Sequence, residues 1–140
     1  MKKILLILSL TLCSCTHNPK YYLYIYYAPA CRVCHSLIQL VVNDIEEYYQ
    51  DDIEVIMMDI DQEDNIEAYA KTCSLLEGYE LNDSSGDVPF LVLDGYFAKV
   101  GFDILEADDL KKAITDSIEG KEISKEIKGI YYFKDNKTYR

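Results

Sequence analysis

The pattern of apolar runs and polar breaks predicts two strands and two helices in the first half of the chain. Residues 21–28 form an almost unbroken aromatic and aliphatic run, which indicates a strand buried on both faces of a sheet. Residues 31–49 carry apolar side chains at helical spacing, and residues 53–60 predict a second strand. Asp61 is expected to cap a further helix that stops near Gly78. This order requires two parallel strands joined by a right-handed crossover.

The first predicted helix is amphipathic along its whole length. On a regular α-helix its apolar residues fall on one stripe, which we expect to face the core. Asp51 and Asp52 then end the element. The members of this stripe are Cys34, Leu37, Ile38, Val41, Val42, Ile45, Tyr48 and Tyr49.

The second half of the chain predicts a hairpin and a covering helix. After a polar loop, Val88-Pro89 leads into an apolar strand at residues 90–93. Asp94-Gly95 is typical of a hairpin turn, which makes residues 96–102 the returning antiparallel strand. Residues 105–119 form an amphipathic helix. The predicted fold class is therefore α/β, with a four-stranded mixed sheet flanked by helices.

Residues 121–140 fall outside this scheme and are interpreted as a C-terminal extension. Within it, residues 130–133 are apolar, and Asp135-Asn136, which is a turn signal, lies between them and residues 137–139. We therefore expect at most a small additional hairpin in this region.

The N-terminal segment has the pattern of an export signal. Lys2 and Lys3 precede an apolar stretch of about nine residues, which is too short to span a bilayer. The stretch ends in Leu12-Cys13-Ser14-Cys15, which resembles the end of a bacterial lipoprotein signal. That resemblance implies cleavage of residues 1–14, lipidation of Cys15 and anchoring in a membrane. The alternative is an ordinary secretory signal that leaves Cys15 as a free thiol.

Composition and charge narrow the functional classes. The chain is 49% hydrophobic and 28% charged, as expected of a globular protein, and its formal net charge is −11. This acidity argues against nucleic acid as a partner, because phosphate binding requires a basic face. The five cysteines are too few for a disulfide scaffold. The spacing of Cys31 and Cys34 points to a redox pair or a metal site.

The Cys31-x-x-Cys34 pair lies at the predicted start of the first helix. Unpaired amides and the helix dipole at that position favour a thiolate at Cys31, and Arg32 and His35 add nearby positive or proton-exchanging groups. Cys34 lies one turn further along, on the apolar stripe. We therefore predict that Cys31 is the attacking nucleophile, that Cys34 resolves the mixed disulfide, and that Arg32 and His35 tune the pair.

Four ordered motifs over residues 21–120 resemble the thioredoxin-like family: Ala28-Pro29-Ala30-Cys31-Arg32-Val33-Cys34, Met58-Asp59-Ile60-Asp61-Gln62, Val88-Pro89-Phe90 and the Asp94-Gly95 turn. The resemblance implies a thioredoxin-like fold and thiol–disulfide oxidoreductase activity. It also implies a cis Val88–Pro89 bond, with Val88 and Pro89 binding the substrate. The chain departs from thioredoxin at Ala30, where thioredoxin has tryptophan, and at Ile25, where it has a buried carboxylate.

The resulting organisation has four parts. Residues 1–14 are the predicted signal peptide, residues 15–20 a lipidated linker, residues 21–120 the thioredoxin-like domain and residues 121–140 the extension. The expected partners are protein thiols and disulfides or a redox carrier protein, together with the membrane through Cys15. We expect a periplasmic or cell-surface location, where disulfides persist. No dissociable cofactor or metal is required, because the two sulfurs carry the electrons.

Three alternative interpretations remain open at this stage. A non-catalytic interaction module with a thioredoxin fold would use the cysteine pair as a structural staple. Cys31-x-x-Cys34-His35 is also the attachment pattern of c-type haem. A structural zinc site would need Cys31, Cys34 and Cys73 with a histidine. Cys73 itself lies on a predicted apolar helical stripe, so we expect it to be buried and inert.

Overall fold

Five strands and the helices around them form an α/β fold. The computed structural model describes residues 18–81 and 87–136. Four short helical turns, at Ile38–Val42, Gln50–Asp52, Ile104–Glu106 and Lys134–Asn136, lie between or after the main elements. The main elements are β1 (Tyr21–Tyr27), α1 (Arg32–Leu37), α2 (Asn43–Tyr49), β2 (Ile53–Asp59), α3 (Glu63–Ser74), β3 (Phe90–Leu93), β4 (Phe97–Val100), α4 (Ala107–Ile118) and β5 (Ile130–Tyr132).

The sheet is open and mixed, with the strand order β2-β1-β3-β4-β5. β1 and β2 are parallel, as the crossover predicted, and the other three pairings are antiparallel. The prediction of four strands is wrong, because β5 adds a fifth. Tyr131 of β5 pairs with Ala98 of β4, so this segment adds a strand to the edge of the main sheet. Residues 137–139, the other half of the expected hairpin, lie outside the described residues.

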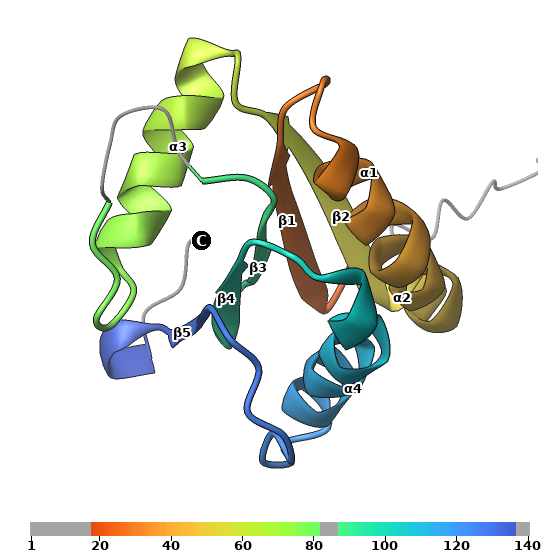
Figure 1. Cartoon of the computed structure of the whole chain (residues 1–140). Helices are drawn as coiled ribbons and strands as arrows, with labels where there is room; N and C mark the ends of the chain where they lie inside the picture. The colour runs from red at the N-terminus through yellow and green to blue at the C-terminus, as the bar shows by residue number, and fades with distance from the viewer. Residues whose placement is uncertain (1–17, 82–86, 137–140) are drawn as a thin grey trace, which may run out of the picture.

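The sheet separates two buried layers (Figure 1). Side chains alternate along β1, so Leu23 and Ile25 point into the layer beneath α1, α2 and α4. Tyr24 and Tyr26 point into the layer beneath α3. Both faces of β1 are therefore buried, which explains why the centre of this strand has no charged residue.

The first helix contains a π turn that changes its buried face. The Asn43 N–H donates to the Ile38 C=O, five residues earlier, so the turn holds one residue more than an α-helical turn. One additional residue sets the later side chains back by about 100° around the axis. Tyr48 is therefore 71% exposed, contrary to the predicted stripe, whereas Tyr49 is half-buried and packs against the core.

The start of α3 also differs from its predicted form. Gln62, not Asp61, occupies the N-cap position, and its side chain makes no capping hydrogen bond. The Asp61 N–H donates instead to the Asp59 carboxylate at 3.0 Å, within the turn that leaves β2. Local hydrogen bonding by Asp59 thus shifts the start of the helix by one residue.

The predicted signal peptide and Cys15 lie outside the described residues. Within the ranges that the structure does describe, no helix is both long enough and apolar enough to cross a membrane.

Candidate functional site

A disulfide joins Cys31 and Cys34 at the start of α1, with the two Cα atoms 5.2 Å apart. Cys31 is the N-cap of this helix, and its sulfur accepts a hydrogen bond from the Cys34 N–H at 3.1 Å. The Cys31 sulfur thus lies where the backbone amides of the first helical turn point, and these amides favour negative charge. The structure holds the pair in its oxidised form.

The two cysteines differ in their access to solvent. Cys34 is 1% exposed, whereas Cys31 is half-buried. Leu37 follows Cys34 on the same buried side of the helix. A thiol or disulfide that approaches from solvent therefore meets Cys31, the more exposed residue of the pair, before Cys34.

The residues around the pair are largely exposed. Arg32 and His35 both lie on the surface, as does Val33, which is 45% exposed. A ring nitrogen of His35, Nε2, lies 3.0 Å from the Pro29 carbonyl oxygen, and this contact ties the helix to the loop that precedes it. His35 and Arg32 thus lie close to Cys31 in the chain, on the outer side of the helix.

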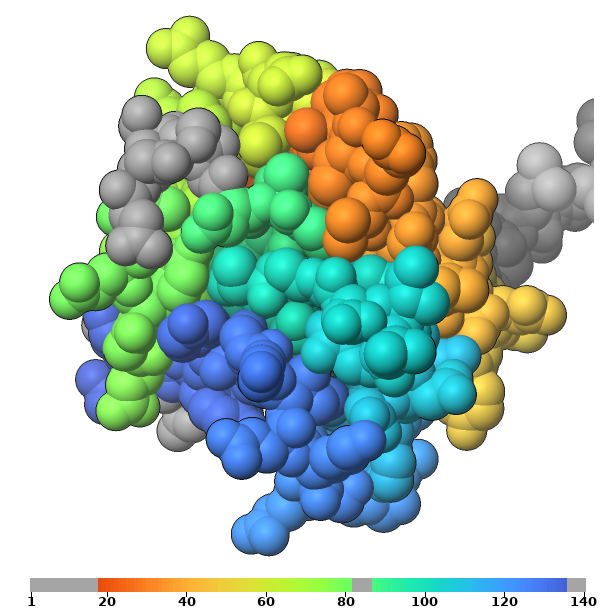
Figure 2. All heavy atoms as spheres, viewed as in Figure 1, coloured from red at the N-terminus to blue at the C-terminus, as the bar shows by residue number. Residues whose placement is uncertain are grey.

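The strand register brings Val88 towards the loop that carries Cys31. Tyr26 of β1 pairs with Phe90 at the start of β3, so Val88 and Pro89 come just before β3 at the end of the sheet where β1 leads to Ala28. The Ala28 C=O accepts a hydrogen bond from the Cys31 N–H at 3.0 Å. Figure 2 shows the surface of α1, in orange, meeting the surface of residues around 90–105, in green to cyan.

The Val88–Pro89 peptide bond is cis, as expected from the sequence. The Pro89 side chain is buried and that of Val88 is half-buried. The Pro89 C=O accepts a hydrogen bond from the Gly101 N–H at 2.9 Å, which ties this segment to the end of β4. Within the described residues, the Val88 backbone makes no hydrogen bond.

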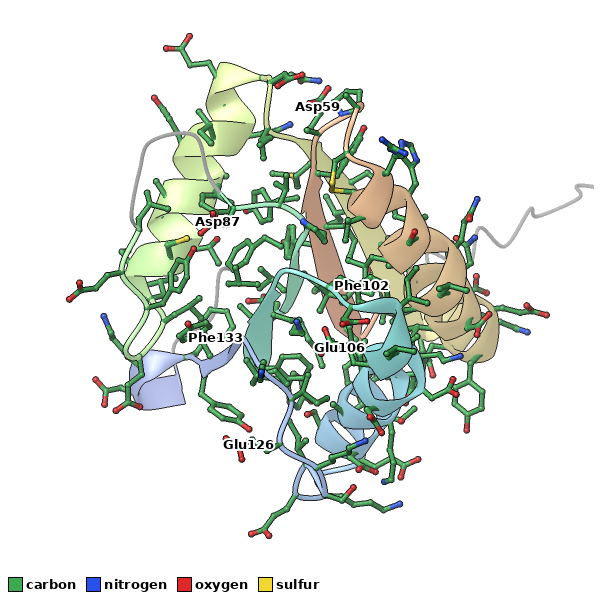
Figure 3. All side chains as sticks on the ribbon, in the orientation of Figure 1. Asp59, Asp87, Phe102, Glu106, Glu126 and Phe133 are labelled. Carbon is green, nitrogen blue, oxygen red and sulfur yellow. A yellow bond between two sulfur atoms is a disulfide. The ribbon has the colours of Figure 1, made fainter. Side chains whose placement is uncertain are left out.

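A tyrosine pair holds the residue that precedes Val88. The buried Tyr69 hydroxyl accepts from the Asp87 N–H at 2.9 Å and donates to the Asp87 C=O at 3.3 Å. The Tyr79 hydroxyl lies 3.2 Å from that of Tyr69 and donates to the Asp87 carboxylate. Burial raises the pKa of both phenols, so they remain neutral donors. Figure 3 shows Asp87 between α3 and the sheet.

Sequence reasoning missed these holding contacts. Helical spacing places Tyr69 on the same apolar stripe as Cys73, and no sequence signal marks Asp87 as its partner. The ion pair between the buried Lys99, near the end of β4, and the half-buried Glu106 was missed as well. In both cases one partner lies in an irregular segment, where hydrophobic periodicity carries no information.

Cys73 lies on the opposite face of the sheet from the disulfide. It is a free thiol, 3% exposed, in the layer between the sheet and α3, so the prediction of a buried cysteine is confirmed. Burial raises the pKa of its thiol to about 11. At neutral pH Cys73 is therefore protonated and a poor nucleophile.

No family model, curated protein or solved structure matches the chain. The thioredoxin-like interpretation therefore rests on the motifs and on the arrangement of the site. Over residues 18–81 and 87–136, no group of three or more histidine, cysteine, aspartate or glutamate side chains is placed to hold a metal ion. The cysteines of the Cys31-x-x-Cys34-His35 pattern are joined to each other, and His35 Nε2 contacts a backbone carbonyl.

Proposed function

We propose that this protein is a thiol–disulfide oxidoreductase of the thioredoxin-like type that acts in the cell envelope. The observation that carries the proposal is the asymmetry of the disulfide. Its accessible sulfur, on Cys31, caps a helix N-terminus, and its second sulfur, on Cys34, is buried one turn further along. A structural staple requires neither feature, whereas disulfide exchange requires both an accessible sulfur and a sheltered one.

The arrangement of the elements supports the same proposal. A parallel β-α-β unit precedes an antiparallel hairpin and a covering helix, in the order expected of a thioredoxin-like domain. The cis bond before Pro89 lies at the end of the sheet where Cys31 follows β1. β5 is an addition at the far edge, separated from β1 by two strands, so it leaves this end of β1 unchanged.

The proposed reaction proceeds in two exchange steps. In the reduced protein, the Cys31 thiolate attacks one sulfur of a client disulfide, forms a mixed disulfide and releases a client thiolate, which takes up a proton. The Cys34 thiol then loses its proton and attacks the Cys31 sulfur. The Cys31–Cys34 disulfide forms and the second client thiol leaves. Two electrons pass to the client, and the reverse sequence oxidises a client dithiol.

The client backbone is proposed to pair with Val88. Asp87 and Pro89, on either side, are both hydrogen-bonded to the rest of the domain, whereas the Val88 N–H and C=O have no partner within the described residues. A backbone donor and acceptor that lack a partner within the described residues, just before β3, can bind a client strand by β-augmentation. The client sulfur would then lie close to Cys31.

The proposal is tested by the reduction potential of the Cys31–Cys34 pair. The protein is equilibrated in dithiothreitol or glutathione buffers, with Cys73→Ala as a control that keeps both active-site sulfurs. A reversible two-electron couple is expected. A value near about −270 mV indicates a reductase, and one near about −120 mV an oxidant. Absence of a reversible couple would refute the proposal and favour a non-catalytic interaction module.

Trapping experiments identify the role of each sulfur. A Cys34→Ser variant should accumulate mixed disulfides with client proteins through Cys31, because the resolving sulfur is missing. The matched Cys31→Ser variant should accumulate none, because Cys34 is buried. Equal trapping by both variants would contradict the assigned roles.

Export and anchoring belong to the same proposal and are tested separately. Labelling of growing cells with a radioactive fatty acid should mark the full chain and a Cys13→Ser variant, but not a Cys15→Ser variant. Labelling that survives the loss of Cys15 would refute lipidation at that position. If the protein is redox-active but carries no lipid, anchoring is refuted and the proposed exchange reaction is unaffected.

A further inference from the structure

Lys99, near the end of β4, is buried, and three acceptors surround its ammonium group. Lys99 is 3% exposed, and its Nζ lies 2.8 Å from a Glu106 carboxylate oxygen. The same nitrogen donates to the carbonyl oxygens of Gly101, at 2.8 Å, and Val100, at 3.2 Å. Burial of an ammonium group is costly unless it is paired and hydrogen-bonded, and here three acceptors meet its three donors.

The pair fixes the connection between β4 and α4. Glu106 also accepts a hydrogen bond from the Asp103 N–H at 3.0 Å, and the Asp103 carboxylate caps the Leu105 N–H at 2.9 Å. Residues 101–106 are thus fixed by two sets of contacts: those of the Lys99 ammonium group, and the capping box before α4. Figure 3 shows Phe102 and Glu106 on this connection, between β4 and α4.

The connection in turn holds the cis-proline segment. The backbone of Gly101 is bonded on both sides: its C=O accepts from Lys99, and its N–H donates to the Pro89 C=O at 2.9 Å. A chain of three contacts therefore leads from the Glu106 carboxylate to the backbone beside Val88. Loss of the Lys99 ammonium would leave both the Gly101 carbonyl and the Glu106 carboxylate without this partner.

We propose that the ion pair of the buried Lys99 with Glu106 positions the backbone for client binding, because it sets the Val88–Pro89 segment through Gly101. This inference rests on the proposed oxidoreductase function. Lys99 is a positioning residue, because it is buried and touches neither sulfur in the structure. Client disulfides that need a backbone partner at Val88 depend on it, whereas small disulfides that need only the Cys31 sulfur do not.

The test compares a protein disulfide with a small one. The full chain, reduced and in detergent, is mixed with an excess of insulin or of 5,5′-dithiobis(2-nitrobenzoate), and the second-order rate constants are measured. For Lys99→Met we expect about a tenfold slower reaction with insulin and a change of less than twofold with the aromatic disulfide. The reduction potential and the pH profile of Cys31 alkylation should stay unchanged.

Two further variants keep the test decisive. Lys112→Met is the control: it makes the same substitution in another lysine–carboxylate pair, that of the exposed Lys112 with the buried Asp116, in the middle of α4. It should leave both rates unchanged. Glu106→Gln keeps an acceptor oxygen, so it serves if Lys99→Met does not fold, and it should slow the insulin reaction about threefold.

Each outcome has one meaning. Equal slowing with both disulfides would overturn the positioning role and leave a general structural role, and unchanged rates would overturn it as well. A wild-type chain that reacts with neither disulfide would instead refute the proposed function.

Discussion

The Tyr69→Phe variant tests how firmly a buried hydroxyl holds the chain in front of the cis peptide bond. The Tyr69 ring is fully buried against Tyr26 and Phe90, and phenylalanine fills the same volume. The substitution therefore removes only the contacts of the oxygen atom. These are the acceptor contact with the Asp87 N–H, the contacts with the Asp87 C=O and the Tyr79 hydroxyl, and a hydrogen bond with the Cys73 thiol.

The magnitude follows from these contacts and their exposure. A hydrogen bond contributes about 0.5–1.5 kcal/mol net, and a buried group that loses its partner costs about 1–3 kcal/mol. Asp87 is exposed and Tyr79 is half-buried, so water can replace part of what the hydroxyl supplied. We expect a loss of about 1–2 kcal/mol in the free energy of unfolding. At roughly 4 °C per kcal/mol for a domain of this size, the Tm should fall by about 4–8 °C.

The assay is thermal unfolding of the oxidised protein, followed by far-ultraviolet circular dichroism. Tyr48→Phe is the control, because Tyr48 is 71% exposed and its hydroxyl makes no hydrogen bond within the described residues. Its Tm should differ from the wild-type Tm by no more than a change of about 0.5 kcal/mol in the free energy of unfolding would produce. If Tyr69→Phe unfolds at the wild-type temperature, the hydroxyl does not hold Asp87, and the reasoning is wrong.

Three further predictions follow from burial and backbone geometry. After reduction, iodoacetamide at neutral pH should modify Cys31 and spare Cys34, as read by peptide mass; comparable modification of both would contradict the assigned asymmetry. Because burial raises the pKa of Cys73 to about 11 from 9.0, its contribution to stability is complete below pH 9 and is lost as the pH rises to about 11. Urea unfolding at several pH values should therefore show a smaller alkaline loss for Cys73→Ala than for wild type; an equal loss would argue against the shift. In urea unfolding, Gly129→Ala should destabilise the protein by about 2 kcal/mol more than Gly120→Ala. Both glycines have positive φ, but only at Gly129 would a Cβ atom lie 2.5 Å from a backbone oxygen. Equal losses of stability in the two variants would refute this prediction.

Local patterns in the sequence were sufficient for most of the fold. The run in β1 and the Asp94-Gly95 turn carry their information within a few neighbouring residues, so the strand and the hairpin were predicted near their observed bounds. The parallel pairing of β1 and β2 followed from the crossover rule. The half-buried and buried positions of Cys31 and Cys34 followed from their spacing on a helix.

The features that the sequence did not reveal depend on partners distant in the chain. The extra strand forms because Tyr131 meets the open edge of β4, and nothing within residues 121–140 signals that edge. Lys99 looks like a solvent-facing position of a hairpin strand, and only the approach of Glu106 shows why it is buried. The exposure of Tyr48 depends on the π turn, which the hydrophobic periodicity of that helix does not indicate.

The π turn also determines which changes in chain length this domain can tolerate. The disulfide belongs to the helical segment before the turn, whereas Ile45, buried in the core, belongs to the segment after it. Deletion of one residue from Ile38–Val42 would restore a regular α-helix and leave the two segments in nearly the same relative rotation, because the π turn already absorbs one additional residue. Insertion of a further residue would instead rotate one segment by about 100° relative to the other, and either Ile45 would leave the core or Cys34 would turn towards solvent. This helix should therefore tolerate the loss of one residue at the π turn better than the gain of one.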